Sequence, residues 1–381
     1  MDKTKSSFIL ATSFFLYSNL QATNLDEMFT SGKLSGDVSI TYESREQDEE
    51  ISKYFSNTKY SVGSIALNYE TATYNNFNIN IGFRKFFEIY EEDHNFITKH
   101  GVGDSTERIY DEKGWTILST AYLNYANENI GIKVGRQDLK TDWLTKSHDA
   151  VAIISNISSK SKLNLIWSKK RGRVTNRELR PFLKINDNDG IYKASLDYNF
   201  GLLDTTTYIL HAPTSHDIYG GKIKINKEFS DIKTGALIHL AKISEKKQED
   251  GDMIELKAYL DINGYKSTLG YVKTGKKNGW ASAADYGDLV VPFEEGINMY
   301  KADAQTIYFM LSKKVYNSYI TGLYGLTEYG DYKGDEFNLW LSHKLNKNTS
   351  FKLGYTLTNE DENDSASTDM RQLNMTLSYK F

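Results

Sequence analysis

The chain of 381 residues has no cysteine, only three prolines and no long apolar run outside its N-terminus. The absence of cysteine excludes disulfide bridges and thiolate metal sites. Scarce proline favours long paired strands, because proline cannot donate to a strand ladder. Charged residues make up 25% of the chain, which excludes a transmembrane helix beyond the N-terminus. The balance of 46 basic and 50 acidic residues gives no reason to expect a nucleic-acid partner.

The N-terminus has the pattern of a secretory signal. Lys3 and Lys5 supply positive charge, residues 8–17 form a short apolar core, and Ala22 is a suitable last residue before cleavage. We therefore expect a signal peptide at 1–22 and a single domain at 23–381, with 23–33 as a periplasmic segment before the first strand.

Alternation of apolar and polar side chains runs almost from end to end. In the last strand one face is apolar and the other polar, and the apolar face holds Leu373, Met375, Leu377, Tyr379 and Phe381. A sandwich strand with one wet face would look the same at this terminus. Similar runs of about 9–12 residues recur along the chain, near the length that a tilted strand needs to cross a bilayer. The pattern favours an all-β, antiparallel transmembrane barrel in a bacterial outer membrane.

Short and long connections also alternate, as they do between periplasmic turns and extracellular loops. We expect short turns near 71–75, 127–129, 201–203, 229–231, 263–264, 316–318 and 346–348, and long loops at 45–59, 88–114, 171–190, 275–303 and 359–369. Keeping all short turns on one side requires a further strand at Asp149–Ile157 that turns at Ser158–Lys160. The expected barrel therefore has 18 strands, with 16 as the alternative, and a barrel of this width encloses water.

Several cations fall in the phase of the polar, lumen-facing side chains and are candidates for lining a channel: Arg84, Lys133, Lys193, Lys222, Lys224, Lys257 and Lys266. Fixed cations in a low-dielectric tube attract carboxylates. Arg136 is a further candidate, but it is in phase with lipid-facing Ile132 and Val134, so it must lie at or beyond the rim.

The densest basic run adds Arg171, Arg173, Arg177 and Arg180 as channel-lining candidates. Binding of lipopolysaccharide phosphates or simple solvation of a loop is the alternative for this run. Candidates for a constriction loop are Asp138, Lys140, Asp142, Lys146 and Asp149. Their carboxylates would orient a dipolar solute or form structural salt bridges.

Other site motifs are incomplete. Gly270–Lys276 lacks the serine or threonine of a phosphate-binding loop, because Lys277 stands there. No full calcium loop or metal-binding histidine pair is present, so we expect no metal and no cofactor. A barrel protease or lipase remains a rival function, with His211 and Ser215 or Asp217 as its residues, and a surface adhesin with a blocked lumen is another.

Short motifs resemble those of OprD-type outer-membrane porins, especially the forms in epsilonproteobacteria. They are the stretch from Asn24 to Gly36, Gly135-Arg136-Gln137 at a strand end, and Trp280 followed by Asp285–Asp288. The resemblance implies an 18-stranded passive channel for small anionic solutes, with a basic ladder facing an acidic patch. The expected partners are small hydrophilic solutes, outer-membrane lipid and lipopolysaccharide, and the assembly machinery that recognises a strand ending in Phe381, with the barrel a monomer or a homotrimer.

Overall fold

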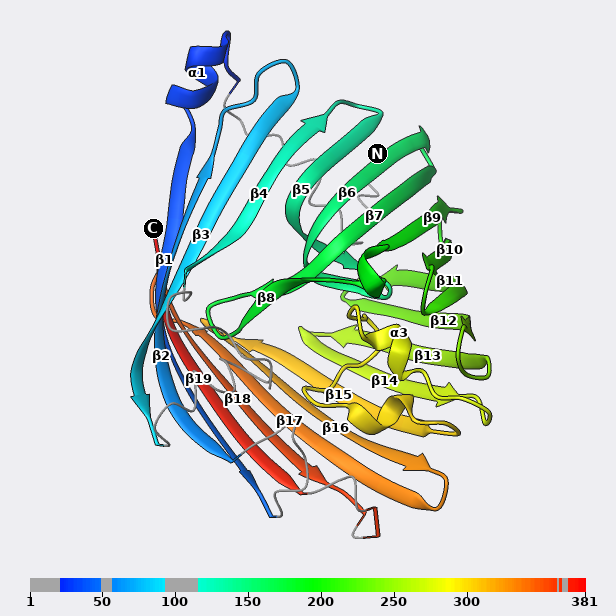
Figure 1. Cartoon of the computed structure of the whole chain (residues 1–381). Helices are drawn as coiled ribbons and strands as arrows, with labels where there is room; N and C mark the ends of the chain where they lie inside the picture. The colour runs from blue at the N-terminus through cyan, green and yellow to red at the C-terminus, as the bar shows by residue number, and fades with distance from the viewer. Residues whose placement is uncertain (1–20, 49–56, 93–115, 362, 365–368) are drawn as a thin grey trace.

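The computed structural model describes residues 21–48, 57–92, 116–361, 363–364 and 369–381 (Figure 1). The predicted signal peptide falls outside the described residues except for its last two positions. Within the predicted 23–33 segment, a short helix α1 (Leu25–Thr30) is capped by Asn24, whose side chain accepts from the backbone N–H of Glu27 at 2.8 Å. No helix among the described residues is long and apolar enough to cross a membrane.

The strands of the described residues are β1 (Lys33–Gln47), β2 (Thr58–Glu70), β3 (Phe77–Glu91), β4 (Thr116–Ala126), β5 (Ile130–Thr141), β6 (Leu144–Ser158), β7 (Ser161–Val174), β8 (Leu179–Lys184), β9 (Ile191–Asn199), β10 (Leu203–Ala212), β11 (His216–Phe229), β12 (Ile232–Glu245), β13 (Gly251–Ile262), β14 (Tyr265–Thr274), β15 (Gln305–Val315), β16 (Ser318–Tyr329), β17 (Tyr332–Lys344), β18 (Thr349–Asn359) and β19 (Met370–Lys380). Short helical turns are η2 (Asn186–Asn188), α3 (Ala281–Ala284) and η3 (Ile297–Tyr300).

Eighteen of these strands form one closed antiparallel wall, which confirms the predicted fold and strand number. Consecutive wall strands pair with each other, β7 pairs with β9, and β1 pairs with β19 to close the ring. The extra strand, β8, pairs with β7 as an antiparallel hairpin and is not part of the wall. Figure 1 shows this hairpin crossing the inside of the barrel.

The alternation expected from the sequence is present in the wall. On β1, the side chain of Ile40 is 51% exposed on the outer face, while its neighbours Thr41 and Glu43 are fully buried on the inner face. The expected short turns are found, including the one at residues 159–160 that the strand count required. One expectation is wrong: much of 171–190 is not a loop, because β7 continues to Val174 and β8 returns beside it.

Candidate channel interior

Three segments fold into the barrel from the end opposite the short turns. They are the tip of the β5–β6 hairpin, the β7–β8 hairpin and residues 275–304, which contain α3 and η3 (Figure 1). Each segment is fixed by contacts to inward-facing side chains of the wall. Together they decide how wide the interior is, so they are described one at a time.

The β5–β6 hairpin turns tightly at Asp142 and Trp143, and Trp143 adopts a left-handed backbone with φ of 63°. Its indole is fully buried and donates from Nε1 to the hydroxyl of Tyr208 at 2.8 Å. That hydroxyl lies 2.7 Å from Nε2 of His239, whose Nδ1 lies 2.9 Å from a carboxylate oxygen of Glu255. This chain of contacts joins the tip to β10, β12 and β13.

Lysines of the wall hold the same tip. Lys222 on β11 forms an ion pair with the carboxylate of Asp142. Lys193 on β9 donates from Nζ to the backbone carbonyl of Asp142 at 2.6 Å. The indole of Trp143 also packs against Trp280, at 5.5 Å between ring centroids, so the tip contacts the third inward segment.

The β7–β8 hairpin reaches the far wall, where β1 and β19 close the barrel. Arg177 at its tip donates from Nε to Glu43 on β1 at 3.0 Å, and Asn176 donates from Nδ2 to Ser378 on β19 at 3.0 Å. Arg177 also pairs with Glu294 of the 275–304 segment. Because Glu43 is fully buried, its charge requires a cationic partner of this kind.

Two of the three remaining arginines of this hairpin also pair with a carboxylate. Arg173 and Arg180 both pair with Glu178, whose side chain is 1% exposed. Arg171 donates to the backbone carbonyl of Asp285. The arginines therefore tie the hairpin to itself and to residues 275–304.

Residues 275–304 are attached to the wall through carboxylates. Glu336 on β17 accepts from the backbone N–H groups of Glu295 and Gly296 at 3.0 and 2.8 Å. Asn298 donates to Glu360, which follows β18. Burial raises the pKa of Glu360 to about 7, and the neighbouring carboxylates of Glu336, Asp364 and Asp369 act in the same direction against Lys301.

A cavity of about 350 Å³ lies beside the β5–β6 tip, toward the short-turn end. Its lining combines six lysines with five carboxylates: Lys133, Lys140, Lys162, Lys222, Lys224 and Lys257, with Asp138, Asp142, Asp197, Asp204 and Glu255. Lys222 and Lys257 are ion-paired, with Asp142 and Glu255. Lys224 lies over the ring of Tyr259, with 5.9 Å from Nζ to the ring centroid.

The other predicted site residues are placed differently. Arg84 is on the inner face but forms a two-point ion pair with Asp37 at 2.6 and 2.9 Å. Lys266 is the second residue of β14, beside a short turn and in the inner-face phase of Thr268 and Gly270. Lys146 lies close enough to Arg171, Arg173 and Arg180 for their charges to act on it.

Arg136 and Asp149 lie at the rim of the wall, where the guanidinium of Arg136 stacks on the ring of Phe182 of β8 at 3.4 Å. They pair directly across β5 and β6, in phase with the outward-facing Val134 and Val151, and form an ion pair at 2.7 Å. The rim position expected for Arg136 follows from this alternation. Asp149 as a constriction residue is a correction, because the register of β6 turns its side chain outward.

Sequence reasoning missed the buried network of Trp143, Tyr208, His239 and Glu255. Each residue lies in a strand or turn whose alternation predicts only an inward direction, not a partner on another strand. It also missed Glu43 and Glu178, which hold the β7–β8 hairpin arginines. The long loop expected at 275–303 was the available signal for an inward segment.

The residues of the rival enzyme do not assemble into a nucleophile and base. His211 Nδ1 lies 2.5 Å from Asp217, but the hydroxyl of Ser215 lies 2.9 Å from Nδ1 of His216 instead. Among the described residues, no group of three or more acidic or histidine side chains is arranged to hold a metal ion.

Comparison with known proteins finds a matching family model and solved structures with a similar fold. A family model described as "Putative outer membrane protein" matches residues 87–360. Among solved structures, OpdK of Pseudomonas aeruginosa with vanillate is similar at a TM-score of 0.74 and 12% identity, over 93% of this chain and 99% of that one. OccAB1 of Acinetobacter baumannii gives 0.73 and 9% over 96% and 99%, and OccAB4 gives 0.72 and 11% over 92% and 98%. No curated protein matches the sequence. At these identities the likeness concerns the fold.

Proposed function

The chain belongs to this family of outer-membrane proteins and has the fold of OprD-type porins, and from that premise we propose that it is a passive channel for small hydrophilic solutes that carry a carboxylate. A concentration gradient drives such flux, so the channel needs no cofactor. The inward segments narrow the path, and charged side chains on the wall select the solute.

The cavity beside the β5–β6 tip carries the proposal. Lys133, Lys222, Lys224 and Lys257 come from three separate regions of the wall and line one space of about 350 Å³. Ammonium groups in a narrow aqueous space with low-dielectric walls lower the entry barrier for a carboxylate. The carboxylates of Asp197 and Asp204 line the same cavity and favour solutes that also carry a donor or a positive group. OpdK, one of the proteins with this fold, was solved with vanillate, which is a carboxylate.

The test is the reversal potential of refolded protein in a planar bilayer with asymmetric potassium chloride. Lys224→Glu is the cleanest change, because Lys222 also holds Asp142. We expect Lys224→Glu to shift selectivity toward cations, and Lys222→Glu with Lys224→Glu to shift it further. Lys227→Glu, near the short-turn end of β11 and in the outward phase of Ile223 and Ile225, is the matched control with the same charge change outside the cavity.

An unchanged reversal potential in both variants would show that these lysines do not border the ion path. An inserted barrel without conductance would show a blocked lumen, as the adhesin hypothesis requires. Turnover of peptides or esters that is lost in His211→Ala would favour the enzyme. Blockage of discrete conducting steps by organic acids is the result that the proposal expects.

A further inference from the structure

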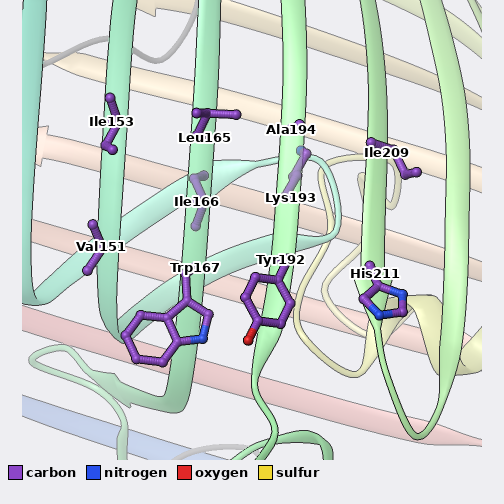
Figure 2. A pocket seen from close by; sticks show the side chains of 10 residues that line it. All are labelled: Val151, Ile153, Leu165, Ile166, Trp167, Tyr192, Lys193, Ala194, Ile209 and His211. Atoms are coloured by element: carbon purple, nitrogen blue, oxygen red, sulfur yellow. The ribbon is translucent and has the colours of Figure 1, made fainter.

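The outer face of the barrel has a depression across β6, β7, β9 and β10 (Figure 2). The strand register produces it. One outward row runs through Ile132, Ile153, Leu165, Ala194, Ile209 and Tyr219, which are direct cross-strand neighbours. Ala194 is the one small side chain in this row, so the surface sinks over it.

The next outward row, one step toward the long-loop end of the barrel, has aromatic side chains where it borders the depression. Trp167 and Tyr192 are paired across β7 and β9, and their side chains are 38% and 48% exposed. Figure 2 shows both rings, with His211 next in the row, at one end of the depression, below Leu165, Ala194 and Ile209 in the view. The space measures about 340 Å³ and is lined almost entirely by apolar atoms. Aromatic rings of this kind mark the membrane–water interface, so the depression begins just inside the hydrocarbon.

Cationic side chains lie directly beyond the aromatic row. Arg136, Asp149 and Lys170 are successive cross-strand neighbours on β5, β6 and β7. Lys184 pairs with Lys170 at the wall end of the β7–β8 hairpin, the end remote from its inward tip, and three of these four residues are positive. Arg136 and Lys170 share the single carboxylate of Asp149, at 2.7 and 3.9 Å. At the other side, His211 and Lys246 share Asp217, at 2.5 and 3.0 Å. The polar border of the depression therefore has an excess of positive charge.

We propose that this face is a binding site for lipopolysaccharide, with one acyl chain in the depression over Ala194 and a phosphate of the headgroup at Lys170 and Lys184. The depression lies at the end of the barrel away from the short turns, which is the end that faces the outer leaflet. An apolar trough with a basic border fits an acylated, phosphorylated lipid, whereas a free anion would use only the border. The site is on the outer wall and is independent of what passes through the lumen.

The acyl part is tested by filling the depression. Full-length protein with its lipid removed in detergent is titrated with rough lipopolysaccharide, and the bound lipid is counted by native mass spectrometry. We expect one lipopolysaccharide to be retained by the unaltered protein and Ala194→Phe to weaken its binding at least tenfold. Ala258→Phe is the matched control, because Ala258 is also an outward alanine, on β13 between Ala236 and Leu269.

The headgroup part is tested by charge reversal. Lys170→Glu with Lys184→Glu should weaken lipopolysaccharide binding to a similar degree. The remaining binding should depend less on salt concentration, because the contacts to phosphate are removed. Lys233→Glu, outside the border, should leave binding unchanged. Phosphatidylglycerol, which has a phosphate and two chains, is titrated in parallel and should bind more weakly than lipopolysaccharide.

Trp167 provides a second readout that does not depend on retention in the gas phase. Among the described residues, it is the tryptophan with an exposed outward ring, since Trp143 and Trp280 are fully buried and Trp340 is in the inward phase of Asn338. Its emission, taken as the difference between the unaltered protein and Trp167→Phe, should change on addition of lipopolysaccharide, and Ala194→Phe should abolish the change. Equal binding by Ala194→Phe and Ala258→Phe, or equal binding of phosphatidylglycerol, would overturn the proposal.

Discussion

Replacing Trp143 by alanine should detach the β5–β6 tip from the wall. The indole is fully buried, donates to Tyr208 and packs against Trp280. Truncation of a buried tryptophan to alanine costs about 3–5 kcal/mol. Since each 1.4 kcal/mol is a factor of ten in an equilibrium constant, the population with a detached tip should rise by roughly two to three and a half powers of ten.

The ion pair of Asp142 with Lys222 remains in this variant, so the tip should open and close rather than leave permanently. Single-channel recording is the direct assay. We expect Trp143→Ala to show larger conductance steps and more open-channel noise than the unaltered protein. Trp143→Phe is the graded control, because it keeps a ring but loses the hydrogen bond, at about 1 kcal/mol.

The wall should not be affected, because Trp143 lies in the turn between β5 and β6 and is not part of their hydrogen-bonded ladder, which ends at Thr141 and Leu144. The temperature at which the folded barrel changes mobility on gel electrophoresis checks this. Conductance and noise in Trp143→Ala equal to those of the unaltered protein, with the barrel intact, would refute the view that this side chain holds the constriction.

The other inward segments give further predictions. Arg177→Ala leaves the buried carboxylate of Glu43 with less charge compensation and frees the β7–β8 hairpin, so conductance should rise. Arg177→Lys keeps the charge and should show a smaller rise. Equal conductance in all three proteins would argue that Arg177 does not hold the hairpin in place. The raised pKa of Glu360 favours its protonated form in the folded protein. The contribution of Glu360 to folding stability is therefore fully present below the pKa of the unfolded state and is lost as pH rises through about 7. The protection factors of residues 294–301 in hydrogen exchange, which correct for the intrinsic rise of the exchange rate with pH, should therefore fall between about pH 5 and pH 8. Glu360→Gln should remove that fall, whereas a fall that persists in Glu360→Gln would assign it to another group.

The wall was largely predictable from the sequence, because alternation and the spacing of turns are local properties. Parity alone required the strand that ends at Ser158, and β6 is found there. The inner or outer direction of Lys222 and Arg136 followed from the same rule. These predictions needed no knowledge of which residues meet.

The interior was less predictable, because its contacts join positions that are far apart in the chain. Arg177 and Glu43 are 134 residues apart, and Arg177 and Glu294 are 117 apart. Nothing in the local pattern of 171–180 indicates that its arginines meet carboxylates from β1 and from the 275–304 segment. The same arginines, judged by type alone, suggest an open basic wall, whereas the structure pairs them.

The seam between the first and last strands bears on how the barrel forms. Asp37 through Gln47 pair with Lys380 through Met370, and Gly36 and Phe381 exchange backbone hydrogen bonds at 3.1 Å in both directions. No other ladder of the wall joins residues so distant in sequence, among those described. Long-range pairings carry the largest loop-closure entropy and form late. The ring can therefore seal only as the last event of folding, and until then β1 and β19 each present an unsatisfied edge that must be protected from other chains.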